Sequence, residues 1–158
     1  SGVRRVDVET AIEMREAVFD SIGKQDLFVA CAAVADYRPE KPEETKIKKC
    51  SDILEFRMKR NPDILAEVAA LPKGPFTVGF AAETHDLLDH AREKLARKGV
   101  DMIAANLVGE GKGFEADWNA LEVIWNGGSR HLPYQDKESL AVELVEVIAS
   151  VVDGGRRS

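Results

Sequence analysis

Short apolar runs alternate with segments of helical periodicity along this 158-residue chain. Residues 27–34 form an unbroken apolar run, which predicts a central strand covered on both faces, as in a parallel sheet. Residues 76–81 and 102–106 predict two more buried strands, and residues 4–8 a further short one. Such strands need helices between them to cover their faces.

Helical periodicity and capping residues predict the intervening helices. Thr10 stands in capping-box spacing ahead of the first helix, and Asn61, followed by proline, is the expected N-cap of the second. Residues 86–98 predict the third helix, and residues 137–152, capped by Asp136, the last. Strand–helix alternation predicts an α/β fold: a three-layer, Rossmann-like domain with a mostly parallel sheet and right-handed crossovers.

Two segments predict small antiparallel elements beside this sheet. Residues 54–59 alternate apolar and charged side chains, which is typical of an edge strand. Its apolar stripe, made of Leu54, Phe56 and Met58, fits either pairing across a dimer axis or an ordinary hairpin packed on its own domain. Residues 121–132, with Asn-Gly-Gly in the middle, predict a hairpin.

Composition predicts a single domain over residues 1–158, with 44 % apolar and 32 % charged residues and no internal repeat. Residues 36–52, rich in Pro, Glu and Lys, predict a mobile flap, and residues 153–158 a frayed tail. No apolar run approaches the roughly 20 residues of a membrane span, and no signal peptide is visible at the start. Two unpaired cysteines, Cys31 and Cys50, complete the expectation of a soluble cytoplasmic protein.

Charge and motif content exclude several classes of function. With 22 basic and 28 acidic residues the net charge is −6, and binding of duplex nucleic acid through phosphates would need a basic face. Walker A and Gly-x-Gly-x-x-Gly motifs are missing from the sequence. Its histidines show no metal-ligand spacing, so metal ligands stay unassigned. Cys31, inside an apolar run, is expected to be an inert buried thiol.

Candidate chemistry gathers where the predicted strands end. Ligands of parallel sheets bind beyond the carboxyl ends of the strands. Asp36, Glu83 and Asn106 are the polar residues closest to three such ends. Polar turn residues follow strands in any α/β protein, so each of the three taken singly also has this ordinary explanation.

Three basic or helix-start features could bind an anion. Lys94 and Lys98 lie four apart on one helix face and could hold an anion between them or simply face solvent. Lys46 is the first residue of a lysine-rich run. This run could belong to a flap that closes over a phosphate-bearing ligand, or it could simply be a solvated charged segment. The first turn of the second helix, residues 62–65, offers free N–H groups, while Asp63 there also complements the helix dipole.

Five blocks occur in an order and spacing that point to one family. They read AAVADYRP at residues 32–39, KIKK at 46–49, KRNPDI at 59–64, VGFAAET at 78–84 and NAL at 119–121. Together they span almost the whole chain and strongly resemble the phosphopantothenate-cysteine ligase domain, the C-terminal half of the bacterial bifunctional coenzyme A biosynthesis protein.

The resemblance implies a CTP-dependent ligation of 4′-phosphopantothenate with L-cysteine in coenzyme A biosynthesis. The reaction would pass through an acyl-cytidylate and release pyrophosphate and CMP. It implies Mg²⁺ and a homodimer, and FMN only where a decarboxylase half is fused upstream. The family's Gly-rich first strand and its Asn-Arg-Ser-Ser-Gly-Lys-Met-Gly segment do not occur here, so the chain is expected to lack the N-terminal part of the domain and its activity alone is open.

The same resemblance implies which residues bind CTP. They are Ala30, Cys31, Ala32, Asp36, Lys46, Pro62, Asp63, Ile64, Leu65, Phe80, Lys94 and Lys98. Lys46 is the expected catalytic residue, acting on the charge of the departing pyrophosphate. A nucleotide-binding module without catalysis is the main alternative. An NAD-dependent reductase rests on fold analogy alone and lacks the glycine fingerprint.

Overall fold

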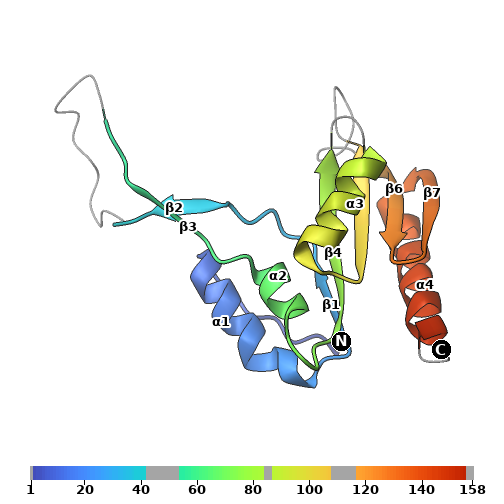
Figure 1. Cartoon of the computed structure of the whole chain (residues 1–158), viewed down its shortest axis with the longest axis horizontal. Coiled ribbons are helices and arrows are strands. Elements are labelled where there is room, and N and C mark those ends of the chain that lie inside the picture. Colours follow the sequence, from blue (N-terminus) through green and yellow to red (C-terminus); the bar gives the residue numbers. More distant parts are fainter. Residues whose placement is uncertain (1, 42–53, 84–86, 108–116, 156–158) are drawn as a thin grey trace.

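The computed structural model describes residues 2–41, 54–83, 87–107 and 117–155. A five-stranded mixed sheet, in the order β1-β4-β5-β6-β7, forms its centre (Figure 1). The strands are β1 (Leu27–Ala30), β4 (Phe76–Glu83), β5 (Met102–Leu107), β6 (Trp118–Trp125) and β7 (Gly128–Asp136). β1, β4 and β5 are parallel, β6 is antiparallel to both neighbours, and β7 again runs with β5. The expected mostly parallel α/β sheet is therefore confirmed.

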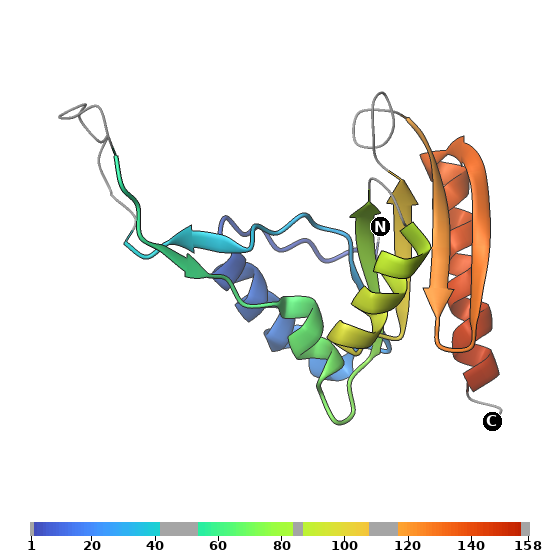
Figure 2. The same ribbon diagram turned by 45° about the horizontal axis from the view of Figure 1, so that its top comes forward.

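Helices cover both faces of the sheet, which gives the predicted three layers (Figure 2). They are α1 (Ala11–Ser21), continued by the 3-10 turn η1 (Ile22–Lys24), then α2 (Ile64–Ala69), α3 (Leu87–Lys98) and α4 (Lys137–Gly155). α4 packs Leu144 and Val147 against one face, over Met102 and Val123. On the other face, Ala91 of α3 packs against β5 in a cluster that includes Leu65 of α2. α1 packs on α2 rather than on the central strands.

Side-chain caps fix the starts of three helices. The Thr10 hydroxyl accepts a hydrogen bond from the Glu13 N–H at 3.2 Å, and the Asp136 carboxylate accepts one from the Ser139 N–H at 2.9 Å. Both caps confirm the prediction. α2 differs, because its N-cap is Asp63 and not Asn61. The prediction that α2 starts two residues earlier, with Asn61 as its cap and Pro62 in its first turn, is wrong. The Asn61 side chain instead donates a hydrogen bond to the Ala35 carbonyl.

β1 corrects the prediction of a central strand covered on both faces. It ends at Ala30 and is the edge strand of the described sheet, and Leu27 and Val29 are each 40 % exposed. A short apolar run indicates that a segment is buried, but it does not show whether the strand has a neighbouring strand on each side. Residues 4–8, expected as a strand, form none.

A two-stranded antiparallel ribbon projects away from the sheet (Figures 1 and 2). It consists of β2 (Tyr37–Pro39) and β3 (Met58–Arg60). The expected antiparallel edge strand is thus present, shifted toward residue 60. Leu54, Phe56 and Met58 are 60 %, 56 % and 52 % exposed, so the stripe does not pack on its own domain.

The expected flap and the expected frayed tail each lie only partly within the described residues. Residues 37–39 of the expected flap form β2, whereas residues 42–52 lie outside the described residues. α4 extends to Gly155, so residues 153–155 of the expected frayed tail are helical. Within the described ranges, no helix combines the length and the apolar character that crossing a membrane requires.

Candidate functional site

A cavity of about 1140 Å³ opens at the carboxyl ends of β1 and β4. Its lining includes eleven of the twelve residues predicted to bind CTP, namely Ala30, Cys31, Ala32, Asp36, Pro62, Asp63, Ile64, Leu65, Phe80, Lys94 and Lys98. The twelfth, Lys46, lies outside the described residues. Residues spread over almost seventy positions of sequence therefore meet around one hollow, as the strand-end rule requires.

The segment after β1 forms one wall of the cavity. Because β1 ends at Ala30, Cys31 follows the strand and its side chain is exposed, so the expectation of a buried thiol is wrong. Asn61 ties this wall to the start of α2. Its amide donates to the Ala35 carbonyl at 2.8 Å, and its backbone N–H donates to the Asp36 carbonyl at 2.8 Å.

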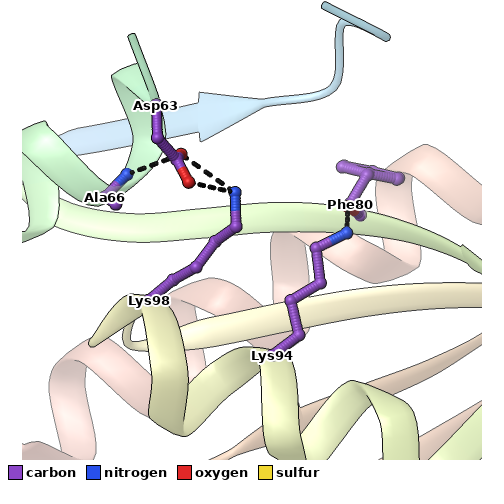
Figure 3. Close-up of polar contacts among 5 residues, drawn as sticks. All are labelled: Asp63, Ala66, Phe80, Lys94 and Lys98. Atoms are coloured by element: carbon purple, nitrogen blue, oxygen red, sulfur yellow. Dashed lines mark hydrogen bonds and ion pairs between the residues drawn. The ribbon is translucent and has the colours of Figure 1, made fainter. Parts of the chain in front are cut away.

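An ion pair joins α2 to α3 across the cavity (Figure 3). Lys98 Nζ lies 2.8 Å from Asp63 Oδ2 and 2.9 Å from Oδ1, and Oδ1 also accepts the Ala66 N–H at 3.2 Å as the cap of α2. Burial works to raise the pKa of Asp63, but these two hydrogen bonds and the charges of Lys98 and Arg97 outweigh it and lower the pKa. Asp63 is therefore a carboxylate at neutral pH.

Lys94 projects from the same face of α3, one turn earlier. Its Nζ donates to the Phe80 carbonyl of β4 at 3.0 Å (Figure 3). The side chain of Lys98 is only 20 % exposed, and both lysines line the cavity. Of the two explanations left open by their spacing, the solvent-facing one is therefore wrong for this pair. Each ammonium instead points into the hollow and rests on an internal acceptor.

Gly79 brings α2 close to the sheet. It is paired with Ala30 and Ile103 in the neighbouring strands. A Cβ at this position would lie 2.5 Å from Leu65 Cδ2 and 3.1 Å from Ile103 Cδ1. Only glycine leaves that space free, so it sets how closely the start of α2 approaches β4 and where Asp63 meets Lys98.

The cavity also includes polar residues that the sequence did not assign to the site. The strand-end rule predicts Asn106 there, but it does not predict Arg60, Asn119 or Lys137. For Asn119 and Lys137, the predicted hairpin was the feature of the sequence that could have placed them at the site. Because β6 is antiparallel to β5, the start of β6 and the end of β7 reach the same edge as the ends of the parallel strands. Glu83, the other strand-end candidate, has a side chain outside the description.

The described lining is electropositive although the whole chain is acidic. Four cationic side chains, Arg60, Lys94, Lys98 and Lys137, stand against the two carboxylates Asp36 and Asp63. The net charge of the chain is −6. A local cluster of this kind concentrates an anionic ligand within about a Debye length of the cavity without a basic surface elsewhere.

Metal-binding side chains do not gather in the described part of the chain. No group of three or more His, Cys, Asp and Glu residues there could hold an ion. His131, one of the histidines, instead places Nδ1 2.6 Å from the Glu122 carboxylate on the β6–β7 hairpin. Asp36 and Asp63 are the carboxylates that face the cavity, and Asp63 is already paired with Lys98.

Comparison with known families decides the assignment. Residues 1–152 match the model of the DNA/pantothenate metabolism flavoprotein C-terminal domain. The chain belongs to this family. A curated relative from Vibrio cholerae serotype O1, the coenzyme A biosynthesis bifunctional protein CoaBC, is 49 % identical over 151 residues, covering 93 % of this chain and 38 % of the relative. The protein of the same name from Escherichia coli strain K12 is 46 % identical over 160 residues, covering 98 % and 39 %.

Solved structures agree with the family assignment. The C-terminal domain of a coenzyme A biosynthesis bifunctional protein CoaBC superposes with a TM-score of 0.75 at 29 % identity, over 94 % of this chain and 66 % of that one. The DNA/pantothenate metabolism flavoprotein from Streptococcus pneumoniae gives a TM-score of 0.74 at 18 % identity, over 92 % and 72 %, which supports the fold alone. The chain spans somewhat more than a third of the length of the curated relatives.

Proposed function

We propose that this domain catalyses the CTP-dependent ligation of 4′-phosphopantothenate with L-cysteine in coenzyme A biosynthesis. The observation that carries the proposal is the convergence of eleven predicted CTP-binding residues on one cavity. The names of the relatives, which are bifunctional proteins of coenzyme A biosynthesis, support the pathway. FMN would belong to a fused decarboxylase half and has no role in the steps below.

The nucleotide would bind along β1, β4, α2 and α3. Backbone groups at residues 30–32 are fixed at the end of a strand and can read the donors and acceptors of cytosine, with Phe80 beside them. Lys94 and Lys98 can donate to phosphate oxygens by turning from the Phe80 carbonyl and the Asp63 carboxylate. Asp63 already forms an ion pair with Lys98 in the free protein. A bound phosphate would therefore have to compete with the Asp63 carboxylate for the Lys98 ammonium.

The reaction must bring two anions together. A carboxylate oxygen of the acid attacks the α-phosphorus of CTP, a P–O bond forms, and pyrophosphate leaves with the electrons of the broken P–O bond. The cysteine amine then attacks the acyl carbon, CMP leaves as its oxygen anion, and the amine loses one proton. Positive side chains lower the barrier of the first step by stabilising charge on the departing group, and we assign this role to Lys46.

Mg²⁺ fits the site as a companion of the triphosphate. Mg²⁺ is commonly held by one or two carboxylates together with substrate phosphates, and Asp36 is the cavity carboxylate that has no ion pair in the described structure. Asp36 would hold the ion from the wall after β1. When bound, the metal would screen the charge of the phosphates.

The exposed β2–β3 ribbon would join two copies of the domain. Leu54, Phe56 and Met58 are more than half exposed, and the ribbon has unpaired edges within the described residues. Burying such a stripe against a second copy relieves both features. Sedimentation at micromolar concentration should show a dimer, and a monomer would remove this part of the proposal.

Pyrophosphate release tests the proposed reaction. The full-length protein should release pyrophosphate with CTP, 4′-phosphopantothenate and Mg²⁺, and should form the cysteine adduct only when cysteine is added. Lys46→Ala should lower turnover by roughly 10²-fold, the scale of losing one contact to developing charge. Lys24→Ala, which replaces an exposed lysine of η1 outside the cavity lining, is the control and should keep full turnover. CTP binding without pyrophosphate release would support the non-catalytic module instead.

A further inference from the structure

One end of the cavity is built by residues that the proposed CTP contacts do not use. Asn106 is the penultimate residue of β5, Asn119 is the second residue of β6, and Lys137 is the first residue of α4. The nucleotide residues named above come from the opposite end, on β1, β4, α2 and α3. The cavity therefore has a second polar region, formed where the antiparallel hairpin meets the parallel strands.

Three independent elements supply this region. Asn106 and Asn119 are half-buried, so their amides are held in place by the sheet, whereas Lys137 is exposed and can reach a ligand. The Asn119 side-chain oxygen accepts the Ala120 N–H at 2.9 Å, which leaves its NH₂ group as the part able to donate outward. The Lys137 backbone N–H donates to the Asp117 carbonyl at 3.0 Å, which ties the start of α4 to the start of β6.

Helix stability does not account for a lysine at this place. A cation in the first turn of a helix is opposed by the helix dipole, and the cap of α4 is already supplied by Asp136. Within the described residues the Lys137 ammonium has no ion-pair partner, in contrast to Lys98. Lys137 does, however, line a cavity whose described side chains carry more positive than negative charge.

We propose that Lys137 and Asn119, beside Asn106, form a phosphate-binding site at this end of the cavity. An ammonium and amide NH₂ groups are hydrogen-bond donors, and that donor set suits a phosphate group and not a cation. The proposal rests on the proposed function, because both substrates of that reaction carry phosphate: CTP as a triphosphate and 4′-phosphopantothenate as a monoester. The shared chemistry is a phosphate oxyanion, and the two sources are separated by experiment.

Calorimetry on the full-length protein tests the site without requiring turnover. Two ligand pairs differ only in their phosphates: CTP against cytidine, and 4′-phosphopantothenate against pantothenate. The second pair is titrated after saturation with α,β-methylene-CTP, which cannot release pyrophosphate. Lys137→Gln removes the charge, Lys137→Arg keeps it, and Lys73→Gln is a matched control in the turn before β4, at the opposite edge of the sheet.

Lys137→Gln should weaken at least one phosphate-bearing ligand by about 10- to 100-fold and leave its unphosphorylated counterpart unchanged. Lys137→Arg should restore most of the affinity, and Lys73→Gln should behave as wild type. A loss confined to CTP assigns the triphosphate, and a loss confined to 4′-phosphopantothenate assigns the monoester. Asn119→Ala should act in the same direction on the same ligand.

Two results would overturn the site: unchanged affinity of Lys137→Gln for both phosphorylated ligands, or equal losses for the phosphorylated and unphosphorylated members of a pair. Failure of the proposed reaction looks different. In that case the wild-type protein releases no pyrophosphate, yet its affinity for at least one of the two phosphorylated ligands still depends on Lys137.

Discussion

Substitutions at Asp63 can separate its two contacts, one that caps α2 and one that holds Lys98. Oδ1 accepts the Ala66 N–H at 3.2 Å, and the carboxylate lies 2.8 Å from Lys98 Nζ. Asp63→Ala removes both contacts. Asp63→Asn keeps an oxygen that can accept the Ala66 N–H, because asparagine is among the best N-cap residues, but it removes the charge that pairs with Lys98.

The structure sets the size of each loss. Removing an N-cap acceptor costs about 0.5–2 kcal/mol. The ion pair is worth up to about 1 kcal/mol, because the Asp63 side chain is 49 % exposed and solvent screens the attraction. Asp63→Ala should therefore lower the free energy of unfolding by about 0.5–3 kcal/mol and Asp63→Asn by about 1 kcal/mol or less. At about 2–4 °C per kcal/mol, the Tm of Asp63→Ala should fall by roughly 1–12 °C.

Urea unfolding followed by circular dichroism measures these differences. Both variants should keep the wild-type slope of free energy against urea, since neither changes the surface exposed on unfolding. Equal destabilisation by Asp63→Asn and Asp63→Ala would show that the charge, and not the cap, carries the stability. Wild-type stability of Asp63→Ala would show that neither contact matters, and the account of how α2 is anchored to α3 would be wrong.

The same pair predicts a pH dependence with a definite sign. The pKa of Asp63 is lowered in the folded protein from its ordinary value of 3.8. A carboxyl group with a depressed pKa adds stability above its unfolded pKa and loses it as pH falls through the folded pKa. The difference in stability between wild type and Asp63→Asn should therefore be constant near neutral pH and disappear below pH 3.8.

Two further substitutions test the walls of the cavity. Gly79→Ala should cost about 1–3 kcal/mol of stability, because its Cβ would meet Leu65 at 2.5 Å, and calorimetry should show weaker CTP binding as the start of α2 shifts. Full stability with unchanged CTP affinity would refute the close approach. Cys31 should react with a thiol reagent, because it is exposed in the lining, and CTP should slow that reaction in a Cys50→Ser background. Equal rates with and without CTP would place Cys31 outside the nucleotide site.

Local sequence patterns predicted most elements of the fold. The caps Thr10 and Asp136, the hairpin and the alternation of strands with helices depend on contacts between near neighbours in sequence, and all are confirmed. The local pattern predicts Asn61 as the cap of α2, because sequence cannot show that the Asn61 side chain binds the Ala35 carbonyl, 26 positions away. Long-range partners of this kind decide between two good capping residues.

Burial along β1 was the property that sequence predicted least well. An apolar run indicates that side chains avoid water, but an edge strand and a central strand can have the same composition. The exposed Leu27 and Val29, and the exposed Cys31 just past the strand, follow from where β1 ends and which strands adjoin it. Those are properties of the sheet and not of the segment.

The candidate site could be predicted as far as the parallel strands alone determine it. Strand-end residues such as Asp36 and Asn106 follow from the rule that parallel strands share an edge. Lys137 could not be predicted in this way, because the rule covers only the ends of parallel strands and not a hairpin whose first strand runs antiparallel to its neighbour. In an antiparallel hairpin both chain ends return to one side of the sheet, so the residue before β6 and the residue after β7 necessarily reach the edge where β5 ends. A mixed sheet thus places more of the chain at its binding edge than a purely parallel one of equal size. It does so on the side away from α2 and from α3, which carries the two lysines proposed to bind the nucleotide. Substrates with phosphates at two separate positions need cations on both sides of a cavity, and this topology supplies them from distant segments.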